Sequence, residues 1–385
     1  MINFACRHYK GSKPCTYNKI DGSECPSCTH FSAYQERVLF IKLDAIGDVF
    51  RSESLLPGII ARHNAPYIAW LTGRPSAPLI RLMPHVDEVI ELSDEGLVRI
   101  MAGDWHQVYS LSNDLTSASL ATLASRGGTP VGFYMRDGCI TPSNEAAMCW
   151  LEMGAFDRLK ASNLLTYQRR MLDILGEPAD TPISPPRLNL DEALRRAAAA
   201  RLASLFGDSP RPKVAINIGA SGRWPKKMLK AEQIYAYCQI LLRKIDADVL
   251  LLGGDAEEEK GAAILAMRQP RDRIEAAFTG NSVLEFVGLL AEVDVLLCGD
   301  TLALHIAPAL NLPTVAIFGP TSFAEIHTFD GLIAKTRVAT LDCLVCQGDC
   351  QKHDNCMSLM DLAELVDLTL AQLSRASRSF PKSGG

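Results

Sequence analysis

Two aspartates, Asp44 and Asp48, lie in the turn that follows a short, mostly apolar run, residues 37–43, and could perform acid–base chemistry. A run of this length is typical of a buried strand, and open α/β sheets bind ligands at the carboxyl ends of their strands. Gly47 lets the backbone approach a ligand closely. If the Asp48 carboxylate points into such a site, it can act as a general base; the alternative is that it caps the following helix.

A second motif, residues 299–307 (Gly-Asp-Thr-Leu-Ala-Leu-His-Ile-Ala), lies between two apolar runs and predicts a strand, a polar turn, a helix and another strand. Asp300 or Thr301 stands at the expected N-cap, where backbone N–H groups and the positive helix end favour an anion such as a nucleotide diphosphate. His305 follows Thr301 by one helical turn and can face the same ligand. The alternative is an ordinary capped helix with His305 in the core or on the surface.

A third candidate is the loop of residues 219–227, which follows the apolar run 214–218. Its small residues allow the chain to pass near a phosphate, and a hydroxyl and a lysine can bind phosphate oxygens. A solvated basic loop is the alternative. Another strand candidate, residues 249–252, is followed by Gly-Gly-Asp. We therefore predict a nucleotide-sugar site formed by Gly219, Ser221, Lys227, Asp255, Asp300, Thr301 and His305.

Short apolar runs alternate with helical segments in both halves of the chain, which predicts parallel sheets with crossover helices. Four prolines between residues 177 and 186 indicate a linker. The two halves resemble two similar Rossmann-like domains, with a cleft where the carboxyl ends of their strands face each other. We predict a cysteine-rich N-terminal segment (1–36), an acceptor domain (37–186), a nucleotide-sugar domain (187–340) and a cysteine-rich loop with a closing helix (341–385).

Composition and charge bear on the partners and on the cellular location of the protein. The chain has 385 residues, 48% of them hydrophobic, with a net charge of −5 and no outstanding basic run, so nucleic acid is not an expected partner. No apolar run approaches the ~20 residues that span a bilayer. The first residues lack the apolar core of a signal peptide. We therefore expect a cytoplasmic protein, with peripheral membrane contact left open.

Four motifs in this order resemble glycosyltransferase family 9, the ADP-heptose heptosyltransferases of lipopolysaccharide synthesis. They are residues 42–48, 217–227, 300–307 and 318–321, and the similarity extends over most of the chain. The resemblance implies the GT-B fold, an α/β architecture of two Rossmann-like domains facing a central cleft. The first domain would bind the acceptor and the second the sugar nucleotide.

The same resemblance implies the reaction. A heptose or related sugar would move from an ADP-sugar to an acceptor hydroxyl with inversion, and Asp48 would be the general base. Lys227 and the helix start at Thr301 would stabilise the leaving ADP, with no catalytic metal. The acceptor could be a lipid-linked saccharide, a protein or a small molecule.

Two other functional classes remain as alternatives. Another sugar-nucleotide enzyme, such as an epimerase, would need a dinucleotide fingerprint after the first strand, and residues 44–48 do not provide one. A non-catalytic nucleotide-binding or metal-bound scaffold protein is the second alternative. The presence of Asp48 weighs against it.

Eight of the twelve cysteines form two groups, one near each end of the chain, and each group contains one Cys-x-x-Cys pair. Thiolates at this spacing suit structural zinc or iron, and some family relatives bind iron at a C-terminal cluster. Reduced thiols or disulfides formed during handling are the alternatives. The other four, Cys139, Cys149, Cys238 and Cys298, are expected to pack in the core. The predicted metal ligands are Cys6, Cys15, Cys25 and Cys28 in the N-terminal quartet, and Cys343, Cys346, Cys350 and Cys356 in the C-terminal quartet.

Overall fold

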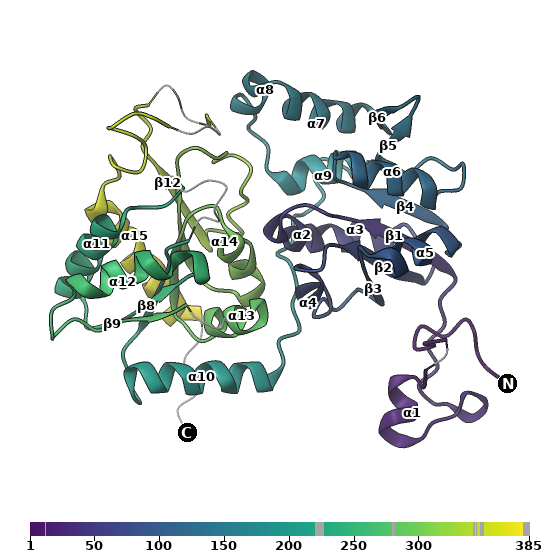
Figure 1. The fold of residues 1–385 in the computed structure, drawn as a ribbon, viewed down its shortest axis with the longest axis horizontal. Coiled ribbons are helices and arrows are strands. Elements are labelled where there is room, and N and C mark those ends of the chain that lie inside the picture. The colour runs from purple at the N-terminus through teal and green to yellow at the C-terminus, as the bar shows by residue number, and fades with distance from the viewer. Residues whose placement is uncertain are drawn as a thin grey trace. The chain divides into compact units, whose positions relative to one another are not determined.

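The computed structural model describes residues 1–11, 13–219, 227–278, 282–341, 343, 345–346 and 350–379 (Figure 1). The chain divides into two compact units whose segments interleave. The first unit contains residues 1–45, 55–151 and 170–181, and the second contains residues 46–54, 152–169 and 182–385. None of the helices in these described ranges is long and apolar enough to cross a membrane.

The first unit is built on a six-stranded sheet in the order β3-β2-β1-β4-β5-β6. Its first five strands run parallel, and β6 pairs antiparallel with β5. The order around β1 is that of a Rossmann sheet. The strands are β1 (Glu36–Ile41), β2 (Pro66–Thr72), β3 (Glu88–Glu91), β4 (Gln107–Ser110), β5 (Val131–Arg136) and β6 (Cys139–Pro142).

Short helices connect these strands, and the apolar side chains of β1 and β2 are buried between them and the sheet. The N-terminal segment before β1 contains one short helix and one 3-10 turn. The elements are α1 (Thr16–Asp21), η1 (Cys25–Ser27), α3 (Leu56–Ala61), α4 (Ala77–Ile80), α5 (Asp94–Ala102) and α6 (Leu115–Ala124). Three further elements have residues in both units or lie at their boundary: η2 (Ser52–Leu55), α7 (Glu145–Ala155) and α9 (Tyr167–Leu175).

The second unit repeats this strand order in a sheet of six parallel strands, β12-β11-β10-β7-β8-β9. Every residue of β8 and β11 is buried, which is consistent with the apolar residues that follow the first position of each strand. The strands are β7 (Lys213–Asn217), β8 (Asp248–Leu252), β9 (Ile274–Ala277), β10 (Val295–Cys298), β11 (Thr314–Phe318) and β12 (Ile333–Arg337).

The last helix of the second unit packs against this sheet and against α11. Leu365 and Val366 are fully buried there, and the Tyr237 and Thr369 hydroxyls join the two helices at 2.7 Å. The helical elements are α2 (Ile46–Arg51), α8 (Asp157–Ala161), α10 (Glu192–Phe206), α11 (Ala231–Lys244), η4 (Asp255–Glu257), α12 (Glu258–Met267), α13 (Val283–Ala291), α14 (Leu302–Ile306), η5 (Ala307–Leu310) and α15 (Leu362–Ser379).

The two Rossmann-like sheets confirm the predicted fold class. The sequence analysis was wrong in placing Cys139 and Cys149 in the core, because both are exposed, whereas Cys238 and Cys298 are buried as expected. The proline-rich stretch, residues 177–186, contains no helix or strand.

Candidate active site

The predicted base Asp48 lies in the first turn of α2, within the second unit. Its Oδ1 pairs with Nη2 of Arg51 at 2.6 Å, and the Asp48 side chain is 37% exposed whereas that of Arg51 is 10% exposed. Residues three apart on a helix face the same side, so this pair follows from the helix itself. A partly exposed carboxylate therefore stands beside a buried guanidinium, which fixes its orientation.

The buried side of Arg51 rests on an aromatic ring. The guanidinium carbon lies 3.7 Å from the centre of the Tyr167 ring, a close cation–π contact. The Tyr167 hydroxyl is hydrogen-bonded to Ser52 Oγ at 2.8 Å, and the Ser52 hydroxyl lies 2.8 Å from the backbone oxygen of Asp48. These contacts of Tyr167 and Ser52 hold α2, and with it the Asp48–Arg51 pair, in position.

Helix α2 packs tightly against α14, and Gly47 makes this approach possible. A Cβ atom built on Gly47 would lie 2.6 Å from Cδ2 of His305 and 3.5 Å from the Cα of Leu302. The predicted nucleotide-sugar motif therefore lies directly against the helix that carries the predicted base. The sequence motifs 42–48 and 300–307 meet in space at this point.

Asp300 lies between a lysine and a histidine. Its Oδ2 is 3.9 Å from Nζ of Lys227, and its Oδ1 is 3.7 Å from Nε2 of His305. Thr301 is the N-cap residue of α14, but its side chain makes no capping bond; its hydroxyl accepts a hydrogen bond from Asn217 Nδ2 at 2.9 Å instead. This bond ties the end of β7 to the start of α14.

The electrostatics of the site follow from burial and from these charges. Burial, together with the positive charge of Arg51, lowers the pKa of His305 to about 4, so its ring is neutral at neutral pH. Burial opposes the charge of Arg51, yet the carboxylate of Asp48 raises the pKa of the guanidinium above its ordinary value. Burial also raises the pKa of Glu325, whose backbone oxygen accepts a hydrogen bond from Tyr167 N. The permanent cations beside Asp48 and Asp300 are therefore Arg51 and Lys227.

Comparison with known families decides the assignment. The model of glycosyltransferase family 9 (heptosyltransferase) matches residues 156–356, just over half of the chain, and covers Asp300, His305 and Lys227. The chain belongs to glycosyltransferase family 9. This family 9 enzyme is a glycosyltransferase of the heptosyltransferase type.

Several relatives of this family 9 enzyme match it over most of their own length. Lipopolysaccharide heptosyltransferase 2 of Escherichia coli (strain K12) is 25% identical over 310 residues, 74% of this chain and 83% of the relative. The solved structure of E. coli ADP-heptose lps heptosyltransferase II superposes with a TM-score of 0.67 at 20% identity, covering 88% of this chain and 99% of that one. The iron-containing dodecameric glycosyltransferase TibC from enterotoxigenic E. coli H10407 superposes with a TM-score of 0.52 at 14% identity, covering 90% and 77%. These likenesses show that this chain has the GT-B fold.

Four predicted site residues of this family 9 enzyme lie together, namely Lys227, Asp300, Thr301 and His305. Gly219 follows β7 and sits against Glu257, because an added Cβ would lie 2.8 Å from Glu257 Cδ. Asp255 begins η4 beyond the end of β8, and no contact in the described structure joins it to the cluster. Ser221 lies outside the described residues. Gly219 and Asp255 therefore stay predictions that rest on their place at strand ends.

Arg51 was not singled out from the sequence. A signal for Arg51 was available, because it follows Asp48 by three residues on a predicted helix. No local signal identifies Tyr167 as its partner, since the two residues come from distant segments.

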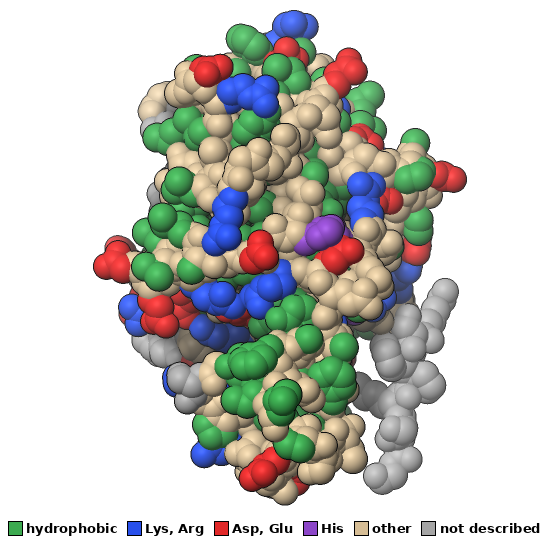
Figure 2. All heavy atoms as spheres, turned by 90° about the vertical axis from the view of Figure 1, so that its right-hand side faces the viewer, with side chains coloured by type: hydrophobic (Ala, Val, Ile, Leu, Met, Phe, Trp, Pro, Cys, Tyr) green, Lys and Arg blue, Asp and Glu red, His purple; other side chains and the backbone are tan. Residues whose placement is uncertain are grey.

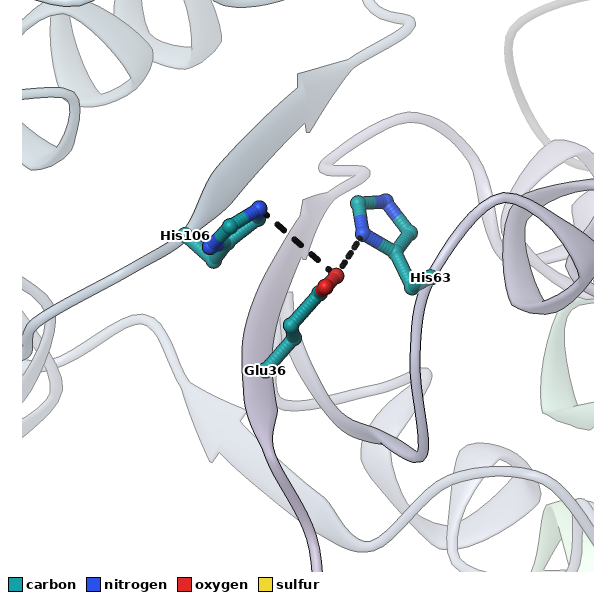
Figure 3. Close-up of side chains that lie close together, drawn as sticks. All are labelled: Glu36, His63 and His106. Carbon is teal, nitrogen blue, oxygen red and sulfur yellow. Dashed lines mark hydrogen bonds and ion pairs between the residues drawn. The ribbon is translucent and has the colours of Figure 1, made fainter.

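A separate cluster lies at the amino end of the sheet in the first unit (Figure 3). His63 Nδ1 lies 2.6 Å from Glu36 Oε2 and His63 Nε2 lies 2.9 Å from the Tyr109 hydroxyl, whereas His106 Nε2 is 3.6 Å from Glu36 Oε2. The hydrogen bond from His63 lowers the pKa of Glu36. Both nitrogens of His63 have protein partners, and ligands of α/β sheets bind at the opposite strand ends. We therefore interpret the cluster as a brace between β1 and β4.

Among the described residues, that cluster is the only group of three or more His, Cys, Asp or Glu residues whose ligand atoms all lie within 4.8 Å. In neither of the described cysteine quartets do three sulfur atoms lie within 4.8 Å of one another. The C-terminal cysteines are nevertheless neighbours: burial raises the pKa of Cys356, and the nearby thiols of Cys346, Cys350 and Cys343 raise it further. Gly319 provides the space for Cys356, since an added Cβ would lie 2.3 Å from its Sγ.

Proposed function

We propose that the enzyme transfers a heptose from ADP-heptose to a hydroxyl group of a lipopolysaccharide acceptor, with inversion and with Asp48 as the general base. The observation that carries this proposal is the Asp48–Arg51 pair on α2, packed through Gly47 against His305 of the family motif. The names of the E. coli relatives support the donor and the acceptor class. Protein and small-molecule acceptors are the alternatives, and a comparison of acceptors with one ADP-heptose donor would distinguish them.

The Asp48 carboxylate takes the proton of the acceptor hydroxyl as its oxygen forms a bond to the anomeric carbon. The bond between that carbon and the β-phosphate oxygen breaks, and ADP leaves with the electron pair. Attack from the face opposite the leaving group inverts the anomeric centre. Arg51 pairs with Oδ1 of Asp48 and so orients the carboxylate that takes the acceptor proton.

Negative charge develops on ADP as the bond breaks, and Lys227 is the cation placed to stabilise it. Its side chain is 15% exposed, so water screens its charge little. The start of α14 at Thr301 would add to this stabilisation, although α14 has only five residues and a short helix has a small dipole. His305, being neutral, would contribute a hydrogen bond rather than a charge.

Lys227→Ala is expected to weaken the binding of ADP by at least about tenfold, since hydrogen bonds to charged groups contribute about 1.5–3 kcal/mol. Adenosine, which lacks the phosphates, should bind with nearly unchanged affinity. Isothermal titration calorimetry with both ligands measures the difference, and Lys213→Ala, on the amino end of β7, is a matched control. Equal weakening of ADP and adenosine would show that Lys227 does not contact the diphosphate.

We propose further that the enzyme is cytoplasmic and touches the membrane that carries its acceptor. Its twelve cysteines suit a reducing compartment. Phe156, Leu164 and Leu165 are 58%, 87% and 38% exposed, and the exposed Arg158 lies on α8 among them. Exposed apolar side chains with a neighbouring cation suit the interface of an anionic bilayer.

Phe156→Ser combined with Leu164→Ser is expected to lower binding to anionic phospholipid vesicles by at least about tenfold, because each apolar side chain buried contributes about 1.5–3 kcal/mol. Vesicle co-sedimentation measures this binding. Leu359→Ser, at a leucine that is 46% exposed elsewhere on the second unit, is the control and should bind normally. Unchanged binding of the double variant would remove this surface from the proposal.

We also propose a structural metal ion, zinc or iron, at the C-terminal quartet of Cys343, Cys346, Cys350 and Cys356. The proximity of Cys343, Cys346 and Cys350 to Cys356 supports the proposal, and so does the similarity in fold to the iron-containing TibC. Four thiolates leave no open coordination position for substrate. The reaction proposed above accordingly uses no metal.

A further inference from the structure

The N-terminal segment, residues 1–35, has ordered turns and a helix but no hydrophobic core. None of its described side chains is buried. Its large apolar residues lie on its surface instead, and many green side chains cover this segment in the lower part of Figure 2. A segment of this size needs a cross-link or a metal to hold one structure. The exposed apolar residues are Met1, Ile2, Phe4, Ile20 and Phe31.

Four cysteines of this segment line a single cavity of about 470 Å³. Each is held by local backbone structure. Cys15 is the N-cap of α1, and its Sγ accepts a hydrogen bond from Asn18 N at 3.5 Å. Cys25 and Cys28 lie at the start and the C-cap of η1, a tight turn closed by the bond from Cys28 N to Cys25 O. Cys6 is fixed by an isolated β-bridge to Ala33.

Two histidines, His8 and His30, line the same cavity, but their rings already interact with other side chains. His30 Nε2 is 2.8 Å from Asp21 Oδ2, and the His30 ring stacks on Tyr17 with centroids 3.9 Å apart. The ring of His8 also packs against Tyr17 in an edge-to-face arrangement. The aromatic stack therefore accounts for the histidines, and the four thiols remain as the ligand set.

We infer that Cys6, Cys15, Cys25 and Cys28 bind one structural zinc ion as four thiolates. The turn at Cys25 and Cys28 presents two sulfurs from one side, while Cys6 and Cys15 come from two other parts of the segment. Binding releases the four thiol protons and closes the site, so no water or substrate coordinates the ion. This inference does not depend on the proposed transfer reaction.

Zinc binding would also tighten the segment. No three of these sulfurs lie within 4.8 Å of one another in the described segment. Tetrahedral zinc with Zn–S bonds of about 2.3 Å places its sulfurs about 3.8 Å apart. The ion therefore draws α1, η1 and the bridge at Cys6 together and replaces the missing core.

The segment is attached to the sheet of the first unit next to its cysteines. Arg7 Nη1 contacts both carboxylate oxygens of Asp87 at 2.7 and 2.8 Å, and Asp87 in turn accepts a hydrogen bond from Ile68 N on β2. Because Arg7 directly follows Cys6, the zinc site fixes the residue that makes this contact. Loss of zinc should therefore open the segment locally and leave the two sheets folded.

The test compares zinc content by inductively coupled plasma mass spectrometry in the full-length protein. Cys25→Ser with Cys28→Ser should hold one zinc ion fewer per chain than the wild type. Cys139→Ser with Cys149→Ser removes two exposed cysteines outside both quartets and should hold as much as the wild type. Because the zinc content of each variant is compared with that of the wild type, metal bound at the C-terminal quartet contributes equally to both and does not affect the difference.

A second measurement uses the unaltered protein, in case the variant fails to fold. A zinc chelator should speed trypsin cleavage within residues 1–35 and expose these four thiols to a maleimide, identified by peptide mass mapping. Added zinc should reverse both effects. Equal zinc in the two double variants, iron instead of zinc, or disulfides among these cysteines in freshly isolated protein would each overturn the inference.

Discussion

Asp48→Asn is expected to lower the turnover of sugar transfer by about 10²–10⁴-fold, the usual contribution of a general base. The amide keeps the shape of the side chain but cannot accept the acceptor proton. ADP affinity should change little, because the diphosphate is assigned to Lys227 and the start of α14. Release of ADP in the presence of acceptor measures turnover, and calorimetry measures ADP binding.

The ion pair with Arg51 makes a control necessary, because Asp48→Asn also removes a charge beside a buried guanidinium. Thermal unfolding separates the two effects: a small change in melting temperature together with a large loss of turnover identifies a chemical role. Asp208→Asn, at an exposed aspartate between α10 and β7, should alter neither quantity. If Asp48→Asn turns over at nearly the wild-type rate, Asp48 is not the base.

The place of Asp48 at the end of a buried strand could be predicted from sequence, because a short apolar run followed by a polar turn is typical of such a strand. The structure puts it in the first turn of α2 and pairs it with Arg51, so the capping interpretation does not describe its observed contact. The brace formed by Tyr167 could not be predicted. It depends on tertiary packing that leaves no periodic signal near either residue.

The strands that could be identified best from the sequence have long buried apolar stretches, namely the last four residues of β1, of β8 and of β11. The hairpin of β5 and β6 was missed because its burial is partial and its sequence includes Arg136 and Cys139. The predicted helix after Asp48 is divided into α2, η2 and α3, and Pro57 at the start of α3 marks the last break. Partial exposure and local breaks weaken the periodicity on which such predictions depend.

Gly47→Ala is expected to reduce turnover by at least about tenfold and to destabilise the second unit by about 1–3 kcal/mol, the usual effect of overpacking a tight contact. The added methyl would lie 2.6 Å from His305 Cδ2, so α2 and α14 must separate or His305 must move. The His305 side chain is only 10% exposed, so it has little room to move. Because Gly47 directly precedes Asp48, a shift of α2 also moves the proposed base, and misplacement by about 1 Å can cost about 10²-fold.

Gly58→Ala gives the matched control, because Gly58 also lies in a short helix, α3. Its added methyl would meet the end of the Glu177 side chain at 3.3 Å, which can yield by rotating. Replacing a helical glycine with alanine without a clash stabilises by about 0.5–1 kcal/mol, so Gly58→Ala should be neutral or slightly stabilising. Chemical denaturation and steady-state kinetics of both variants make the comparison. Equal stability and turnover of the two would mean that α2 and α14 do not need their close approach, and the coupling of Asp48 to the nucleotide-sugar motif through Gly47 would fail.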